Sequence, residues 1–409
     1  MDDASRSLSI VRLGSLGDGI AADGTVVPGA LPGEDVSGKI RDGRLERPRI
    51  LKASAHRVRP PCPHHADCGG CALQHARDGF VAAWKQDQVL KALKAQGMSA
   101  KVEAIHTSPV NARRRAVLSA RRTRKGALVG FHARASGTVV EIADCVVMRP
   151  ALLATLPSLQ PAVRALASRR GELSVYLTET LSGVDVDIRG ARALGLGERH
   201  LLAEVAEAQD LARISVEGEP VATRRQPLVR MGRALVPLPP GAFLQATAEG
   251  EAALVAFVRE ALSGCRQVAD LFAGVGTFAL PLAEDARVHA LEGDRAAVEA
   301  LAAARNGTEG LRQLDVARRD LFRQPLDEAE LSAFDGVVID PPRAGAAAQM
   351  RALATAGPAR IASISCNPAT FARDARILAT GGYRLRRLVL VDQFRWSHHI
   401  EIAALFERA

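Results

Sequence analysis

The chain has 409 residues, of which 47% are hydrophobic and 24% charged, the composition of a folded protein rather than a disordered one. This length exceeds what one hydrophobic core usually holds, so roughly two or three domains are expected. No run of about 18 or more apolar residues occurs, and the stretch from Met1 to Ser7 lacks the pattern of a secretory signal. We therefore expect a cytoplasmic protein without a membrane span, with a monomer as the default.

Basic residues outnumber acidic ones, 54 to 45, which gives a formal net charge of +9 and suits a partner such as nucleic acid. Positive charge is concentrated in "NARRRAVLSARRTRKG", where seven basic residues lie between Arg113 and Lys125. On a strand or hairpin they would form a phosphate-binding surface, although a solvated charged face explains this stretch equally well. Aromatic residues make up only 4%, so any platform for stacking bases must be small.

Three regions differ in their sequence pattern. Residues 1–54 contain short apolar stretches broken by Gly, Pro and Asp, which predicts a small β-barrel. Residues 55–240 start with a segment rich in Cys and His, continue with a predicted helix from Val81 to about Gln96, and then mix strand-like and helical stretches, typical of an α+β domain. Residues 241–409 alternate short apolar strands with helices, which predicts an α/β domain with an open, mostly parallel sheet.

Six cysteines point to metal binding or catalysis, because disulfides are rare in proteins inside the cell. Cys62, Cys68 and Cys71 have the spacing C-x5-C-x2-C, and Cys145 lies far along the chain. Four thiolates suit either a [4Fe–4S] cluster or structural zinc, and the nearby His64, His65 and His75 favour zinc, so the spacing leaves both open. Cys265 has no evident partner and is predicted to lie in the core.

Chemically active side chains follow four predicted strands of the last domain: Asp270, Glu292, Asp340 and Cys366. Ligands of such sheets bind at the carboxyl ends of the strands, so these residues are expected to meet in one crevice. The "GVG" after Asp270 allows close approach to a ligand, and Glu292 is placed to accept hydrogen bonds from ribose hydroxyls. This spacing fits NAD and S-adenosylmethionine equally, but "DPPR" at Asp340 favours a methyltransferase.

Cys366 lies where a strand turns into a helix, in "ISCNPATFARD". A buried core thiol is the usual explanation for such a cysteine. However, the N-terminus of a helix favours negative charge, so we expect a lowered pKa and a reactive thiolate. Glu401 in "SHHIEIAALF" is predicted to lie on one face of a strand with His399 and to act as a base, because a carboxylate in an apolar strand needs a reason.

Several motifs together resemble the bacterial RNA uridine-C5 methyltransferases, which make 5-methyluridine in tRNA and 23S rRNA. The resemblance covers nearly the whole chain. In order it runs through "LGSLGDGIAADGTVVPGALPGEDV", similar to a TRAM-type barrel, "PPCPHHADCGGCALQH" with "IADCVV", similar to an iron–sulfur pattern, and then "FLQAT", "DLFAGVGTF", "LEGD", "DPPRAG", "SCNPATFARD" and "SHHIEIAALFER".

The resemblance implies a Rossmann-like methyltransferase domain that uses S-adenosylmethionine, with Cys366 as nucleophile toward uracil C6 and Glu401 as the base that removes the C5 proton. The residues it places at the cofactor are Gln245, Phe272, Thr277, Glu292, Asp320 and Asp340. It also implies a [4Fe–4S] cluster held by Cys62, Cys68, Cys71 and Cys145, and an RNA partner, with 23S rRNA favoured over tRNA. The family usually has Asn at positions 247 and 277 and Pro at 395, where this chain has Thr247, Thr277 and Arg395.

Two other hypotheses remain. The first is an RNA-binding or folding protein whose methyltransferase-like domain no longer reacts, against which the presence of both Cys366 and Glu401 argues. The second is an amino-group methyltransferase acting on adenine or cytosine. That class needs an aromatic residue after Asp-Pro-Pro, where Arg343 stands, and needs no nucleophilic cysteine.

Overall fold

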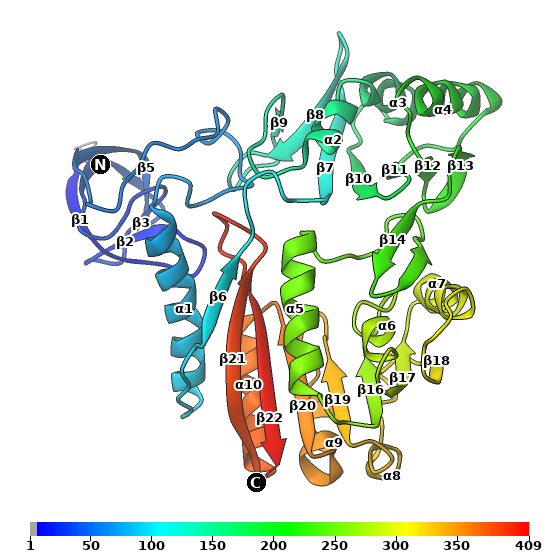
Figure 1. Cartoon of the computed structure of the whole chain (residues 1–409). Coiled ribbons are helices and arrows are strands. Elements are labelled where there is room, and N and C mark those ends of the chain that lie inside the picture. Colours follow the sequence, from blue (N-terminus) through cyan, green and yellow to red (C-terminus); the bar gives the residue numbers. More distant parts are fainter. Residues whose placement is uncertain (1–5, 409) are drawn as a thin grey trace.

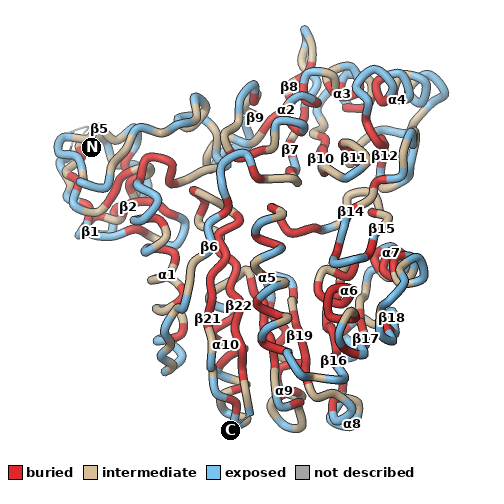
Figure 2. The backbone as a smooth tube through the Cα atoms, viewed as in Figure 1, coloured by how far each residue is buried: buried red, intermediate tan, exposed pale blue. Residues whose placement is uncertain are grey.

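The computed structural model describes residues 6–408, which form a small barrel, a central sheet and a large C-terminal sheet (Figure 1). Buried residues are concentrated in the strands of the C-terminal sheet and on one side of the helices around it (Figure 2). Across this described range, no helix combines the length and the apolar character needed to cross a membrane.

The N-terminal strands close into a five-stranded barrel with the order β1-β2-β3-β5-β4. The barrel has only five short strands, so a few apolar side chains fill its interior, among them Ile10, Val27, Val36 and Leu45. Its strands are β1 (Arg6–Leu13), β2 (Gly19–Ala21), β3 (Val26–Val27), β4 (Asp35–Arg41) and β5 (Arg44–Lys52). The predicted barrel is therefore confirmed, while residues 1–5 of the predicted first domain lie outside the described residues.

A seven-stranded sheet with the order β13-β12-β11-β10-β7-β8-β9 forms the central region. Its strands are β7 (Arg115–Arg122), β8 (Ala127–His132), β9 (Val139–Glu141), β10 (Leu173–Thr180), β11 (Gly183–Arg189), β12 (Arg213–Val216) and β13 (Glu219–Thr223). The helices α2 (Pro150–Thr155), α3 (Leu159–Leu166) and α4 (Leu196–Ala208) share one hydrophobic core with it. The arrangement agrees with the α+β pattern expected for this part of the chain.

The C-terminal sheet has eight strands in the order β18-β17-β16-β19-β20-β22-β21-β6. Its strands are β16 (Gln267–Leu271), β17 (Arg287–Glu292), β18 (Leu314–Arg318), β19 (Gly336–Ile339), β20 (Arg360–Ser365), β21 (Tyr383–Asp392), β22 (Glu401–Arg408) and β6 (Ala104–Thr107). The first five strands in this order are parallel, and β22 pairs with β20 in the antiparallel direction.

Helices cover both faces of this sheet, so its central strands are apolar throughout. In β19, for example, Val338 belongs to one core while Val337 and Ile339 belong to the core on the other face. The helices that follow the central region in sequence are α5 (Ala248–Ala261), α6 (Ala279–Leu282), α7 (Arg295–Asn306), α8 (Glu328–Leu331), α9 (Ala347–Ala356) and α10 (Pro368–Thr380). The predicted α/β domain with an open sheet is confirmed.

Three segments that precede the C-terminal domain in sequence also pack against it. Helix α1 (Asp78–Ala95) contributes Val89 and Leu93 to the core that contains α10, and β6 extends the sheet beside β21. The hairpin of β14 (Leu228–Met231) and β15 (Ala234–Pro237) packs against α7. Residues on both sides of the predicted boundary at residue 240 therefore share hydrophobic cores. Val229 and Val236 of the hairpin, for example, lie in the same core as Val268 of β16.

Candidate active site

Cys366 and Glu401 lie across from each other on neighbouring strands. Cys366 directly follows β20 and Glu401 begins β22, and the antiparallel register pairs Ser365 with Ile402. The next pair in this register is Cys366 and Glu401. The sequence places them 35 residues apart, and the strand pairing brings them to the same edge of the sheet. His399, predicted to share a strand with Glu401, lies before β22 instead.

The environment of Cys366 differs from the expectation of a lowered pKa. Burial, followed by the nearby carboxyl groups of Glu401 and Asp340, raises the pKa of the Cys366 thiol to about 11. The Arg343 guanidinium acts in the opposite direction but is outweighed. Helix α10 begins two residues after the cysteine and is capped by the side chain of Asn367, yet the pKa of the thiol is raised because it is buried next to two acids.

Three carboxyl groups at this edge of the sheet have raised pKa values. Burial raises the pKa of Asp340 to about 7, and burial together with Asp340 raises that of Glu401 to about 8. Asp270 is fully buried, and burial and the charge of Asp340 hold its pKa well above the usual range. Carboxyl groups that change protonation near neutral pH are suited to transferring protons, as expected of a general base.

Gln393, which the sequence reasoning missed, contacts several of the predicted site residues. Its amide oxygen accepts a hydrogen bond from the backbone N–H of Ala246 at 2.7 Å, and its amide nitrogen donates to Gln245 Oε1. Its side chain also hydrogen-bonds Glu401. Gln245 in turn donates from Nε2 to Asp340 Oδ2 at 3.3 Å. This buried chain of amides connects the predicted cofactor residue Gln245 with the predicted base Glu401.

The predicted ribose ligand Glu292 ends β17 and faces the glycine turn after β16. Its carboxylate accepts hydrogen bonds from the backbone N–H groups of Gly274 at 2.9 Å and Asp294 at 2.8 Å. Gly274 and Gly276 both have positive φ angles, and a Cβ on Gly274 would meet open space. The turn thus leaves room beside the backbone, which fits a nucleoside at the carboxyl end of the sheet. Thr277 is half-buried in the same turn.

An aromatic pair lies next to this turn. The rings of Phe272 and Phe322 are 5.3 Å apart between centroids, and the Phe322 side chain is 52% exposed although apolar. Asp320 accepts a hydrogen bond from the backbone N–H of Phe322 at 3.0 Å and is itself exposed. An exposed ring beside an acidic group and a glycine turn suits an adenine base. Phe322 follows Asp320 by two residues in "RRDLF", so the motif contained the signal.

Side chains of helix α1 form hydrogen bonds with the end of β21 and with the loop between β21 and β22. Lys85 Nζ donates to Asp392 Oδ1 at 2.6 Å and to the carbonyl oxygen of Phe394 at 3.1 Å. Asp78 accepts hydrogen bonds from Arg395 and from Trp396 Nε1. Arg395, which stands where the family usually has Pro, thus ties the loop to helix α1.

The four cysteines predicted to bind a cluster line one small cavity. The cavity is bordered by Cys62, Cys68, Cys71 and Cys145, together with His64, His65 and Arg113. The donor chemistry fits a cluster or a zinc ion. As placed, however, no group of three or more His, Cys, Asp or Glu side chains among residues 6–408 is arranged to hold a metal ion. The predicted [4Fe–4S] cluster is therefore not confirmed and stays a prediction.

The arginine-rich stretch divides into two parts instead of forming one positive surface. Arg114 Nη2 pairs with Glu251 at 2.5 Å, and Arg115 stacks over the ring of Phe243. The first three arginines of the stretch are only partly exposed. At the other end, Arg122 and Lys125 are exposed where β7 turns into β8. The first part therefore connects the central sheet with the start of α5, and only the hairpin tip faces solvent.

A parallel sheet with a glycine turn after β16, an acidic residue at the end of β17 and an added antiparallel strand beside β20 is typical of S-adenosylmethionine-dependent methyltransferases. The model of the tRNA (Uracil-5-)-methyltransferase family matches residues 228–409. The chain is 43% identical over 404 residues to an uncharacterized RNA methyltransferase of Brucella suis biovar 1, covering 98% of this chain and 97% of the relative. The chain therefore belongs to the RNA (uracil-C5)-methyltransferase family.

Two further proteins are similar along the whole length. The 23S rRNA (uracil(1939)-C(5))-methyltransferase RlmD of Shewanella halifaxensis is 35% identical, covering 98% of this chain and 95% of that protein. The crystal structure of Pyrococcus abyssi tRNA (uracil-54, C5)-methyltransferase with S-adenosyl-L-homocysteine superposes with a TM-score of 0.77 at 22% identity, covering 98% and 99% of the two chains. The predicted family and enzyme class are confirmed.

Proposed function

We propose that the protein transfers a methyl group from S-adenosylmethionine to C5 of a uridine in RNA through a covalent bond between Cys366 and C6 of the uracil. The observation that carries this proposal is the register of β20 and β22, which places Cys366 and Glu401 opposite each other. A nucleophile and a base on the same edge of the sheet suit a reaction at two adjacent ring carbons. The same pair argues against an inactive RNA-binding protein.

The proposed reaction begins when the Cys366 thiol gives its proton to solvent water and the resulting thiolate sulfur bonds to C6. The electron pair of the C5–C6 double bond moves onto the ring as an enolate, and C5 then bonds to the methyl carbon while the carbon–sulfur bond of the donor breaks. Glu401 takes the C5 proton, the C6–sulfur bond breaks, and the double bond forms again. A carboxylate with a pKa of about 8 is a stronger base than an exposed one, which favours this last transfer.

The chain's own residues orient the methyl donor. Glu292 and the turn at Gly274 suit the ribose, the pair of Phe272 and Phe322 with Asp320 suits the adenine, and Gln245 suits the methionine part. Asp340 lies between them and Cys366, since it accepts from Gln245 and raises the pKa of the thiol. Thr277 completes the turn, where its hydroxyl replaces the amide usual in the family.

We further propose 23S rRNA as the substrate, in the cytoplasm. This rests on the 35% identity to a 23S rRNA methyltransferase, together with the closed N-terminal barrel, which would contact the RNA. The barrel is fixed to the central sheet because Asp18 accepts hydrogen bonds from Arg44 of the barrel and from Arg134 beside β8. An RNA bound across both parts would contact the barrel and the central sheet together.

The test of this proposal offers 23S rRNA fragments and tRNA to the purified protein with S-adenosylmethionine, and then analyses the nucleosides. We expect 5-methyluridine in one 23S fragment, none in tRNA, and none with Cys366→Ala. Methylated adenine or cytosine as the product would contradict the proposed chemistry. Methylation of tRNA alone would contradict only the proposed target.

For the cysteine cavity we propose a [4Fe–4S] cluster held by Cys62, Cys68, Cys71 and Cys145. The supporting observation is that three closely spaced cysteines and one distant cysteine line the same cavity. Such a cluster would join the segment before α1 to the strands of the central sheet. Anaerobically purified protein should be brown with about four irons per chain, and Cys71→Ala should be colourless. Colourless wild-type protein with stoichiometric zinc would reject the cluster.

A further inference from the structure

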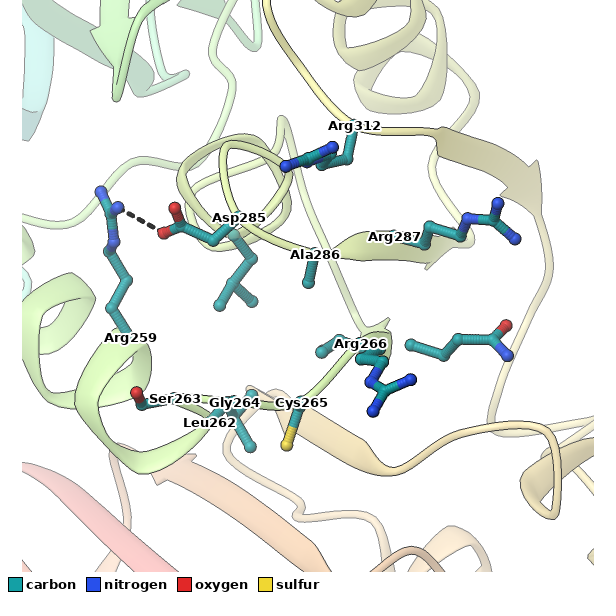
Figure 3. A pocket seen from close by; sticks show the side chains of 13 residues that line it. Arg259, Leu262, Ser263, Gly264, Cys265, Arg266, Asp285, Ala286, Arg287 and Arg312 are labelled. Atoms are coloured by element: carbon teal, nitrogen blue, oxygen red, sulfur yellow. Dashed lines mark hydrogen bonds and ion pairs between the residues drawn. The ribbon is translucent and has the colours of Figure 1, made fainter.

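A large pocket lies at the edge of the C-terminal sheet opposite the candidate active site. It has a volume of about 640 Å³ and is bordered by the end of α5, the starts of β16 and β17, and the turn after α6 (Figure 3). The candidate active site lies at the carboxyl ends of the same strands. With five residues in β16, the two sites are separated by roughly 15 Å along the strand.

Three arginines stand in a row along this edge. Arg266 directly precedes β16, Arg287 begins β17 and Arg312 lies shortly before β18, and these three strands are neighbours in the sheet. A backbone hydrogen bond of 2.9 Å from Arg287 to Arg266 fixes the first two relative to each other. Neighbouring strands are about 4.8 Å apart, so the row spans roughly 10 Å. We call the pocket with this row the arginine pocket.

Among the described residues, three arginines of the arginine pocket have no side-chain ion-pair partner, although the Asp335 carboxylate accepts hydrogen bonds from the backbone N–H groups of Arg266 and Gln267. A fourth arginine on the rim, Arg259, is paired with Glu284 and Asp285. In contrast, within residues 6–408 no acidic side chain forms an ion pair with Arg266, Arg287 or Arg312, and all three are exposed. Figure 3 shows the three guanidinium groups without dashed contacts, unlike Arg259. Guanidinium groups without carboxylate partners suit phosphate oxygens.

The lining of the pocket indicates which anion it takes. No aromatic side chain borders it, so it offers no surface on which a base could stack. The three guanidinium groups point in different directions from neighbouring strands whose backbones span about 10 Å, which suits several phosphates better than one small anion (Figure 3). We propose that the arginine pocket binds the sugar–phosphate backbone of the RNA substrate at a segment away from the target uridine. This rests on the proposed function, because it presumes an RNA held at the opposite edge.

The experiment compares wild-type protein with the triple variant Arg266→Gln, Arg287→Gln and Arg312→Gln. Its matched control is Arg351→Gln, Arg376→Gln and Arg384→Gln, which removes the same charge from exposed arginines outside the pocket. Binding is measured as a function of salt with a long folded rRNA fragment and with a short RNA that contains only the target loop. The melting temperature and S-adenosylmethionine binding of each variant confirm that it is folded.

For the long RNA we expect the triple variant to bind at least about tenfold more weakly at physiological salt, with the salt slope reduced by about two to three, since each phosphate contact contributes about 0.7–0.9. The single variants Arg287→Gln and Arg312→Gln should each reduce the slope by about one. For the short RNA, affinity and turnover should stay within about twofold of wild type.

Equal weakening by the triple variant and its control, or equal weakening for long and short RNA, would overturn the proposal. Unchanged binding of the long RNA by the triple variant would overturn it as well. If wild-type protein makes no 5-methyluridine on any RNA, the proposed function fails, while the comparison of salt slopes still decides whether the pocket binds RNA.

Discussion

Lys85 Nζ lies 2.6 Å from Asp392 Oδ1, and the side chains of the two residues are 0% and 3% exposed. This ion pair joins α1, which follows the cysteine-rich segment, to the last residue of β21. Asp392 directly precedes Gln393 and opens the loop that leads to Glu401 at the start of β22. The position of the proposed base therefore depends on a lysine more than 300 residues away in sequence.

Replacing Lys85 should destabilise the protein because it leaves a buried carboxylate without its cation. For Lys85→Met we expect a loss of about 3–5 kcal/mol in the free energy of unfolding, measured by urea denaturation. The double variant Lys85→Met with Asp392→Asn should lose less, since the amide still accepts from the Phe394 N–H but carries no charge. A double variant as unstable as the sum of the two single variants would contradict this account of the pair.

Gln393 is predicted to position both the methyl donor and the base. In Gln393→Leu the Ala246 N–H loses its acceptor, and Gln245 and Glu401 lose a shared partner. We expect turnover to fall by about tenfold or more, since one buried hydrogen bond contributes about 1–3 kcal/mol when its partner is left unpaired. KM for S-adenosylmethionine should rise as well, and the melting temperature should fall by a few degrees because the buried Ala246 N–H is left without an acceptor. An unchanged KM would place Gln393 outside cofactor binding.

The raised pKa of Glu401 predicts that the base reduces stability at alkaline pH. In the folded protein its pKa is about 8, against 4.5 for the ordinary side chain, so between these values the folded state keeps a proton that the unfolded state releases. Stability therefore falls as pH rises through this window.

Glu401→Gln removes this titration. We expect the variant to be more stable than wild type near pH 8 by on the order of 3 kcal/mol, with the difference shrinking toward pH 5. Thermal unfolding over this pH range measures the difference. A gap that stays constant with pH would mean that the pKa of Glu401 is not raised.

The thiol of Cys366 should react slowly in the free protein. With a pKa of about 11, it is almost fully protonated near neutral pH, so its alkylation by iodoacetamide should accelerate by about tenfold per pH unit up to at least pH 9. Glu401→Gln should increase the rate above pH 8, because it removes a negative charge that opposes the thiolate. A rate that levels off below pH 8 would contradict the raised pKa and support the sequence-based expectation of a lowered one.

Sequence patterns predicted the parts of the fold that depend on local chemistry. Glycine and proline spacing predicted the barrel, and apolar strands alternating with helices predicted the parallel sheet with Asp270, Glu292 and Asp340 at its edge. Long-range packing was not predictable in this way. β6 joins the C-terminal sheet and α1 packs on α10 through contacts between residues far apart in sequence. A local sequence pattern contains no information about such contacts.

The site shows the same division between local and long-range information. Motifs predicted Cys366, Glu401 and Gln245 as site residues, but Gln393 lies in a loop whose contacts form only when distant segments of the chain meet. The pKa of Cys366 could not be inferred from the start of α10 alone, since it also depends on burial and on Glu401 and Asp340 from two other strands. Likewise, Arg114 reads as part of a basic surface in sequence, yet it pairs with Glu251.

The central claim is that the sulfur of Cys366 adds to C6 of the target uracil. The most direct measurement incubates the protein with S-adenosylmethionine and RNA that carries 5-fluorouridine at the target position, and then maps the cross-linked peptide by mass spectrometry. Because fluorine at C5 does not leave as a proton does, we predict a stable, methylated complex attached through Cys366, and none with Cys366→Ala. A complex attached through another residue, or methylation of ordinary uridine by Cys366→Ala, would contradict the claim.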